Sequence, residues 1–134
     1  MAEKIYLMGK LNSAEISISD FASELEERGH EVLAKWWEFP KLPTPYLDYP
    51  DTSSHAAKIM ADAAYNCSVG ILFPDEKILG AAVEFGSAIA STSINPEKKI
   101  IVVNPFETRQ SIFYTHPAVI AIRGIARVRS MDWY

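Results

Sequence analysis

Cysteine, histidine and long hydrophobic runs are scarce in this chain, and each scarcity excludes a class of protein. The single cysteine, Cys67, excludes an internal disulfide, and with only three histidines no Cys/His spacing predicts a zinc site. No apolar run approaches the ~18 residues that cross a bilayer, so we expect no membrane partner. Because the strand-like segment Lys4–Met8 follows the first residue almost at once, we expect no signal peptide and a cytoplasmic location.

An excess of positive charge is also missing. The net charge is −4, so the basic patch typical of a nucleic-acid-binding protein is not expected, although one phosphate pocket remains compatible with it. Hydrophobic residues make up 49% of the 134 positions, enough for one continuous core. We therefore expect one ordered domain over residues 1–134, without a nucleic-acid partner.

What the chain does have is a regular alternation of short apolar runs and longer amphipathic segments. Buried-type strands that alternate with helices indicate a parallel sheet covered on both faces. We predict an α/β, single-domain, flavodoxin-like (Rossmann-like) three-layer sandwich with a five-stranded parallel sheet. The expected strands are 4–8, 31–37, 68–73, 99–103 and 118–122, and the expected helices are 21–28, 53–66 and 80–91, with a short helix or tail at the end.

In this fold, ligands bind beyond the carboxyl ends of the first and third strands. Those ends are Met8–Lys10 and Phe73–Asp75. After the third strand, Gly80 opens a run of small residues that contains one carboxylate, Glu84. An acid in the first turns of a helix tends to stay ionised, and small neighbours let a ligand approach. We therefore expect an ionised Glu84 in the crevice.

Three segments carry a resemblance to a known family: Lys4–Gly9, Cys67–Ala90 and Lys99–Val103. The second segment contains Pro74-Asp75-Glu76 and the run Gly80-Ala-Ala-Val-Glu-Phe-Gly86. The chain resembles the nucleoside 2-deoxyribosyltransferases and the related 2′-deoxynucleoside 5′-phosphate N-hydrolases. The resemblance implies that Glu84 attacks the anomeric carbon of a nucleoside or nucleotide and that Tyr6 hydrogen-bonds this carboxylate. It also implies that no metal or organic cofactor is needed, and that the protein is a homodimer or higher homo-oligomer.

The chain departs from that family at two positions. Where the family places an aspartate on the helix before the third strand, this chain has Lys58, and Asp62 lies one turn further on. Where the family has an aspartate or serine in the loop before the glutamate, this chain has Ile78. These departures keep two alternatives open: a non-catalytic protein that binds a nucleotide or related metabolite, and a structural subunit with a vestigial crevice.

Other residues are candidates for contacts with the substrate. Alternation along the second strand would send Trp36 and Trp37 to opposite faces, so that one packs in the core and the other, which we take to be Trp37, stacks on a base. Lys58 is a candidate for a phosphate contact, with a surface pair to Asp62 as the simpler interpretation. The full predicted set for substrate binding is Gly9, Lys10, Trp37, Lys58, Asp75 and Gly80.

Overall fold

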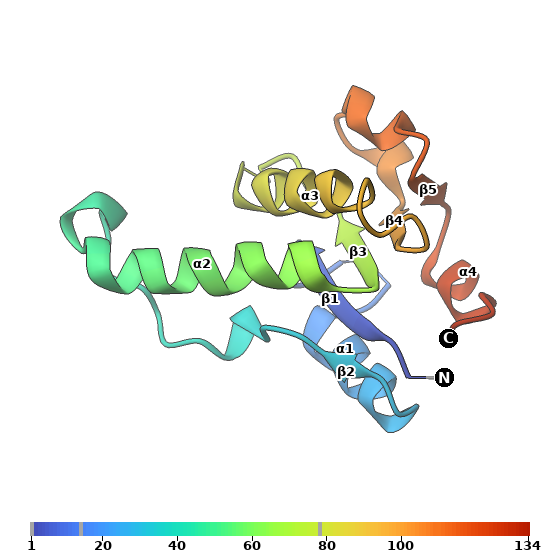
Figure 1. Ribbon diagram of the computed structural model, residues 1–134, viewed down its shortest axis with the longest axis horizontal. Coiled ribbons are helices and arrows are strands. Elements are labelled where there is room, and N and C mark those ends of the chain that lie inside the picture. The colour runs from blue at the N-terminus through green and yellow to red at the C-terminus, as the bar shows by residue number, and fades with distance from the viewer. Residues whose placement is uncertain (1, 14, 78) are drawn as a thin grey trace.

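The computed structural model describes residues 2–13, 15–77 and 79–134. In these ranges the chain alternates strands and helices as the sequence predicts (Figure 1). The strands are β1 (Lys4–Gly9), β2 (Glu31–Val32), β3 (Val69–Phe73), β4 (Lys99–Val103) and β5 (Val119–Ile122). The α-helices are α1 (Ile18–Glu27), α2 (Pro50–Asn66), α3 (Leu79–Ser91) and α4 (Ile125–Arg129).

The five strands form one parallel sheet in the order β2-β1-β3-β4-β5. The order reverses direction between β1 and β3, as in flavodoxin-like folds. All five residues of β3 are buried, which matches its uninterrupted apolar sequence. The predicted fold class is therefore confirmed.

Helices cover both faces of the sheet. Residues that alternate along β1 contribute to two different cores: Leu7 packs on the side of α1 and α4, whereas Tyr6 packs on the side of α2 and α3. The helices α2 and α3 also pack against each other. These three layers fix which functional side chains can meet, because a residue on one face of the sheet cannot reach the other.

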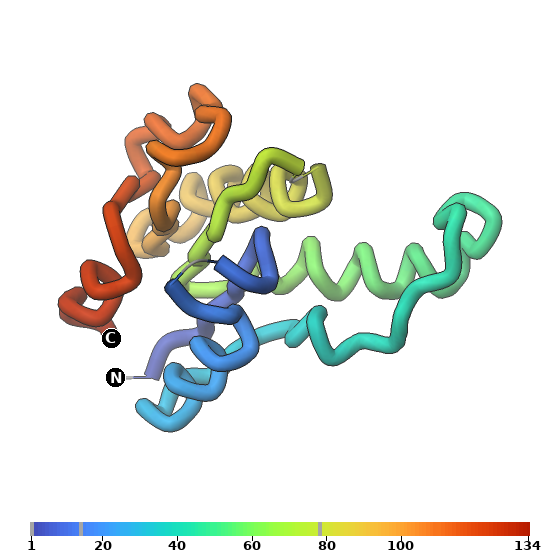
Figure 2. Tube along the Cα trace, turned by 180° about the vertical axis from the view of Figure 1, so that it is seen from behind, coloured from blue at the N-terminus to red at the C-terminus, as the bar shows by residue number. Residues whose placement is uncertain are grey.

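The N-terminal half of α2 extends beyond the sheet, together with the proline-rich segment that precedes it (Figures 1 and 2). Pro50 occupies the first turn of this helix, where its missing N–H is tolerated. The tip of the projection leaves large side chains exposed, including Leu47, which is 92% exposed. The segment between the second strand and this helix thus contains a short 3-10 turn, η2 (Tyr46–Asp48), and the helix starts three residues earlier than predicted.

The second strand differs most from its prediction, because it ends at Val32 instead of Trp37. Ala34 has a positive φ of 42°, which breaks the extended backbone. The chain then forms the 3-10 turn η1 (Trp36–Glu38). The last backbone hydrogen bond between this segment and β1 runs from the Leu33 N–H to the Ile5 carbonyl. Beyond it, the indole N–H of Trp36 donates to the Leu7 carbonyl at 2.8 Å. The alternation argument for the two tryptophans therefore does not apply.

The first helix starts earlier than expected. The sequence predicts a helix from residue 21, but α1 begins at Ile18. Ser17 is its cap, since its hydroxyl accepts a hydrogen bond from the Asp20 backbone N–H. Ser17 thus satisfies one of the backbone N–H groups that have no partner within the first turn of the helix.

Candidate functional site

A tyrosine and a glutamate meet in the layer between the sheet and α3. Tyr6 projects from the middle of β1 toward α2 and α3, beside its register partner Gly70 on β3. A Cβ at Gly70 would lie 3.2 Å from Met8 Cε, so the missing side chain leaves room for Met8 in this layer. Helix α3 buries a stripe at positions 84, 85, 88 and 91, and Glu84 belongs to this stripe.

The Tyr6 hydroxyl donates a hydrogen bond to Glu84 Oε1. Tyr6 is fully buried, and Glu84 is only 8% exposed. Burial raises the pKa of Glu84 from its ordinary 4.5 to about 6, and the Tyr6 hydrogen bond offsets part of that rise. Burial, followed by the neighbouring Glu84 charge, raises the pKa of Tyr6 well above its usual range. The Tyr6 hydroxyl therefore stays protonated and acts as a hydrogen-bond donor. Glu84, by contrast, changes charge near pH 6.

This result differs from the expectation that a helix start keeps Glu84 ionised. Helix α3 begins at Leu79, so Glu84 is its sixth residue and lies beyond the first turn, to which the dipole effect is confined. Removal from water works in the opposite direction and is the larger effect. The pair has the chemistry of a general acid or base, or of a nucleophile, at mildly acidic to neutral pH.

A cavity of about 540 Å³ lies at the carboxyl edge of the sheet, where the strand order reverses. The predicted ligand residues Lys10 and Asp75 line it, from the segments after β1 and β3. Its apolar wall, which includes Phe73 and Val103, belongs to the core on the side of α1 and α4. Neither Tyr6 nor Glu84 lines it. The structure thus places the predicted crevice and the Tyr6–Glu84 pair on opposite faces of the sheet.

Gly9 is required by the backbone at this edge. Its φ is +105°, and a Cβ at this position would lie 2.0 Å from the Phe73 carbonyl oxygen. The tight approach lets the next backbone N–H, of Lys10, donate to the same carbonyl at 2.9 Å. Gly9, Lys10 and Asp75 are therefore gathered at one place, as predicted.

The same cavity contains groups that the sequence interpretation missed. The Glu15 carboxylate accepts hydrogen bonds from the Asn104 side chain and from the Ile125 backbone N–H. The side-chain Oδ1 of Asn104 accepts from the Gly124 backbone N–H at 2.7 Å. This network ties the segment before α1 to the segments after β4 and β5. Asn104 could have been found, because it directly follows a predicted strand, whereas no pattern marks Glu15.

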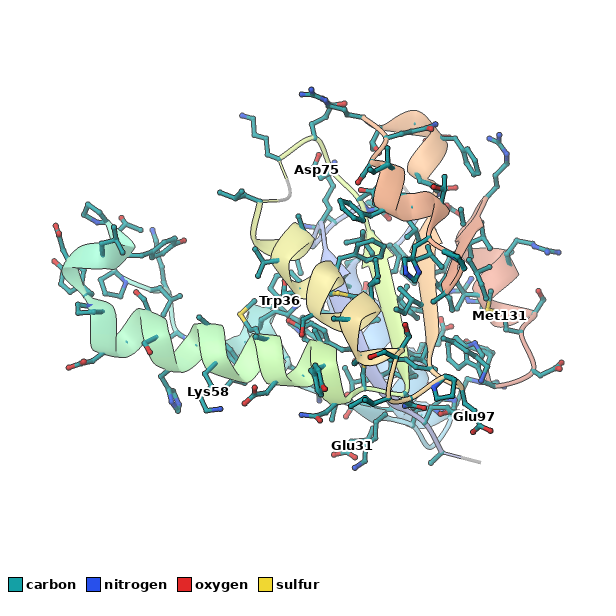
Figure 3. The ribbon with its side chains drawn as sticks, turned by 45° about the horizontal axis from the view of Figure 1, so that its top comes forward. Glu31, Trp36, Lys58, Asp75, Glu97 and Met131 are labelled. Carbon is teal, nitrogen blue, oxygen red and sulfur yellow. The ribbon has the colours of Figure 1, made fainter. Side chains whose placement is uncertain are left out.

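The remaining predicted contacts lie elsewhere. Trp37 packs against the core on the side of α1. Lys58 is exposed and pairs with Asp62 at 2.7 Å, which confirms the simpler interpretation of a surface pair (Figure 3). Gly80 is the second residue of α3 and faces open space. Ile78 lies outside the described residues.

Residues 2–13, 15–77 and 79–134 contain no group of three or more His, Cys, Asp or Glu side chains that could hold a metal ion. Within the same ranges, none of the helices combines the length and the apolar character that crossing a membrane requires.

The fold defines the chain as a flavodoxin-like α/β protein, and comparison with solved structures agrees. The chain is similar to the structure of the CMP N-glycosidase BcmB from Clostridium botulinum, with a TM-score of 0.53 and 24% identity. The match covers 90% of this chain and 88% of that chain. No protein-family profile and no curated protein matches the chain. The likeness therefore establishes the fold over nearly the whole length of both proteins.

Proposed function

We propose that the protein cleaves the N-glycosidic bond of a nucleoside or nucleoside 5′-monophosphate, with Glu84 as the nucleophile. The buried hydrogen bond from Tyr6 to Glu84 is the observation that carries this proposal. A carboxylate oxygen fixed in this way can attack the anomeric carbon of the sugar. The carbon–nitrogen bond breaks, and the base leaves with the electron pair and takes a proton. Water then hydrolyses the glycosyl ester, or a second base displaces Glu84 in an exchange reaction.

The local environment supports this chemistry. Departure of the base develops positive charge on the sugar, and an anion close to the sugar face stabilises it. The Tyr6 hydroxyl holds one carboxylate oxygen, which leaves the other free to react. The similar structure belongs to a CMP N-glycosidase, so a cytidine nucleotide is a reasonable first substrate to test.

The decisive experiment measures release of the free base by chromatography. Purified protein is incubated with deoxynucleosides, ribonucleosides and their 5′-monophosphates. We expect at least one to be cleaved by the wild type, Glu84→Ala to be inactive, and Glu97→Ala, which removes an exposed glutamate after α3, to be active. If the wild type releases no base from any of these compounds, the proposal is wrong.

A second candidate function is binding without turnover. It is favoured by one observation: at the position where the related enzymes have an aspartate, Lys58 is exposed and already paired with Asp62. In this case calorimetry with the same compounds would show tight binding, and chromatography would show no product. Either function is compatible with a homo-oligomer, which light scattering at working concentration would detect.

A further inference from the structure

Trp36 lies at the edge of β1 and packs against the core that contains Tyr6. Its indole N–H donates to the carbonyl of Leu7, the residue that follows Tyr6. This hydrogen bond takes the place of a ladder bond that β2 no longer supplies, so it fixes the ring against the strand. The side chain is only partly buried. A fixed, partly exposed indole is a preorganised apolar surface for a ligand.

The two neighbouring tryptophans differ in which face of the sheet they contact. Trp36 packs against both cores, including the one that contains Tyr6, Met8 and Phe85. Trp37 packs only against the core on the side of α1, and its ring meets that of Trp36 edge to face at 5.4 Å. Of the two indoles, Trp36 is therefore the one on the face of Glu84.

We propose that Trp36 stacks on the base of the nucleoside or nucleotide that Glu84 attacks, which assigns to Trp36 the contact that the sequence alone assigned to Trp37. The assignment rests on the proposed function. Every base has a π-face, so stacking on an aromatic side chain binds bases without requiring a particular hydrogen-bond pattern.

Tryptophan fluorescence tests the contact directly, because the chain has only three tryptophans. The double variant Trp37→Phe/Trp133→Phe retains Trp36 alone, and Trp36→Phe/Trp133→Phe retains Trp37 alone. Both are titrated with cytidine and adenosine 5′-monophosphates and, as a probe without a base, with ribose 5-phosphate. We expect both nucleotides to quench the emission of Trp36 alone and to leave that of Trp37 unchanged. Ribose 5-phosphate should quench neither.

A kinetic comparison separates stacking from a structural role. Trp36→Leu removes the ring, and we expect KM to rise roughly tenfold or more with a smaller change in kcat. Trp36→Phe keeps an aromatic surface and should recover most of that loss. Trp37→Leu is the matched control and should leave KM near the wild-type value.

The outcomes distinguish the two proposals. If the wild type releases base but the emission of Trp36 is not quenched by the nucleotides, the stacking assignment is wrong and the proposed function stands. Equal effects of the Trp36→Leu and Trp37→Leu variants on KM would also overturn the assignment. If the wild type neither binds nor cleaves any base-bearing compound, the proposed function fails and the stacking assignment fails with it.

Discussion

Tyr6 of β1 and Glu84 of α3 are 78 positions apart in the sequence, and the Tyr6 hydroxyl donates a hydrogen bond to the Glu84 carboxylate in the layer between sheet and helix. Both side chains are buried. Burial opposes the charge on Glu84, and the hydrogen bond favours it. The balance between these two effects determines how the proposed reaction and the stability of the fold respond to pH.

The first prediction concerns the pH dependence of base release. A nucleophilic carboxylate acts only when it is ionised, and the pKa of Glu84 is about 6. We expect kcat/KM to be constant above neutral pH and to fall about tenfold for each pH unit below 6, as Glu84 takes up a proton. Rates measured across this range in a constant-ionic-strength buffer would show the midpoint. A midpoint near 4.5 would mean that burial does not raise the pKa of Glu84 in the working enzyme.

The variant Tyr6→Phe tests the other half of the pair. It removes the hydrogen bond that lowers the pKa of Glu84, so we expect the acidic limb to move to higher pH by roughly half a unit to one unit. The same rate measurements apply. Tyr114→Phe is a suitable control, because it removes another buried hydroxyl on the same side of the sheet and should leave the midpoint unchanged. An unchanged midpoint in Tyr6→Phe would show that the hydroxyl does not act on Glu84.

The second prediction concerns stability. In the unfolded chain Glu84 ionises near 4.5, whereas in the folded protein it ionises near 6. Below 4.5 it is protonated in both states, so its contribution to folding is fully present there and is lost as the pH rises to 6 and above. Glu84→Gln cannot ionise, and it should therefore stabilise the protein above pH 7 by up to about 2 kcal/mol. Below 4.5 it should have little effect.

Urea denaturation of the wild type and of Glu84→Gln, above pH 7 and below pH 4.5, measures the difference in their free energies of unfolding. Glu97→Gln serves as the control, since that glutamate is exposed and should show no pH-dependent gain. If Glu84→Gln is less stable than the wild type at alkaline pH, the carboxylate is stabilised by contacts in addition to the Tyr6 hydrogen bond.

Hydrophobic patterning was sufficient to predict the fold. The fourth strand, 99–103, has the predicted bounds, and the apolar third strand is central and buried. These segments are predictable because their side-chain pattern and their environment agree. The end of the second strand was not predictable, because it is determined by a tertiary contact. The Trp36 indole binds a carbonyl of β1 in place of a backbone N–H, and propensity alone does not show this exchange.

The candidate site was predictable only in part. Parallel strands have their carboxyl ends at one edge of the sheet, so the sequence correctly predicts that Gly9, Lys10 and Asp75 lie together there. The position of the strand ends does not say which face of the sheet a helix residue occupies. Glu84 belongs to the buried stripe of α3, so it lies across the sheet from the cavity. Its burial also explains why its pKa is not that of a carboxylate at a helix start.

The third prediction compares two glycines from the predicted substrate set. Gly9→Ala should destabilise the protein by more than about 3 kcal/mol, because φ is positive and the new Cβ would meet the Phe73 carbonyl. Gly80→Ala adds a methyl group in open space on a helix, so it should stabilise by about 0.5–1 kcal/mol. Thermal denaturation measures both. A rise in KM in the stabilised Gly80→Ala variant would show that substrate approaches this residue.

The last prediction concerns Lys98, which joins the C-terminal ends of α2 and α3. Its ammonium group is buried and donates to the Ala64 and Tyr65 carbonyls at 2.6 and 3.0 Å and to Ser91 Oγ at 2.7 Å. These are the last carbonyls of α2, which have no partner within the helix. Lys98→Met would fill similar space but leave the Tyr65 carbonyl without this donor and the Ala64 carbonyl with only the weak Cys67 thiol, so we expect a loss of about 3 kcal/mol in the free energy of unfolding.

Lys99→Met, at the next position, lies at the start of β4 and is the matched control; it should cost less than about 1 kcal/mol. Because Lys98 acts through helix packing and not through Glu84, the midpoint of the pH–rate curve should be the same in both variants as in the wild type. A shifted midpoint in Lys98→Met would mean that the junction of α2 and α3 also sets the environment of the carboxylate. Equal stability of the two variants would show that solvent replaces the ammonium group at these carbonyls without cost.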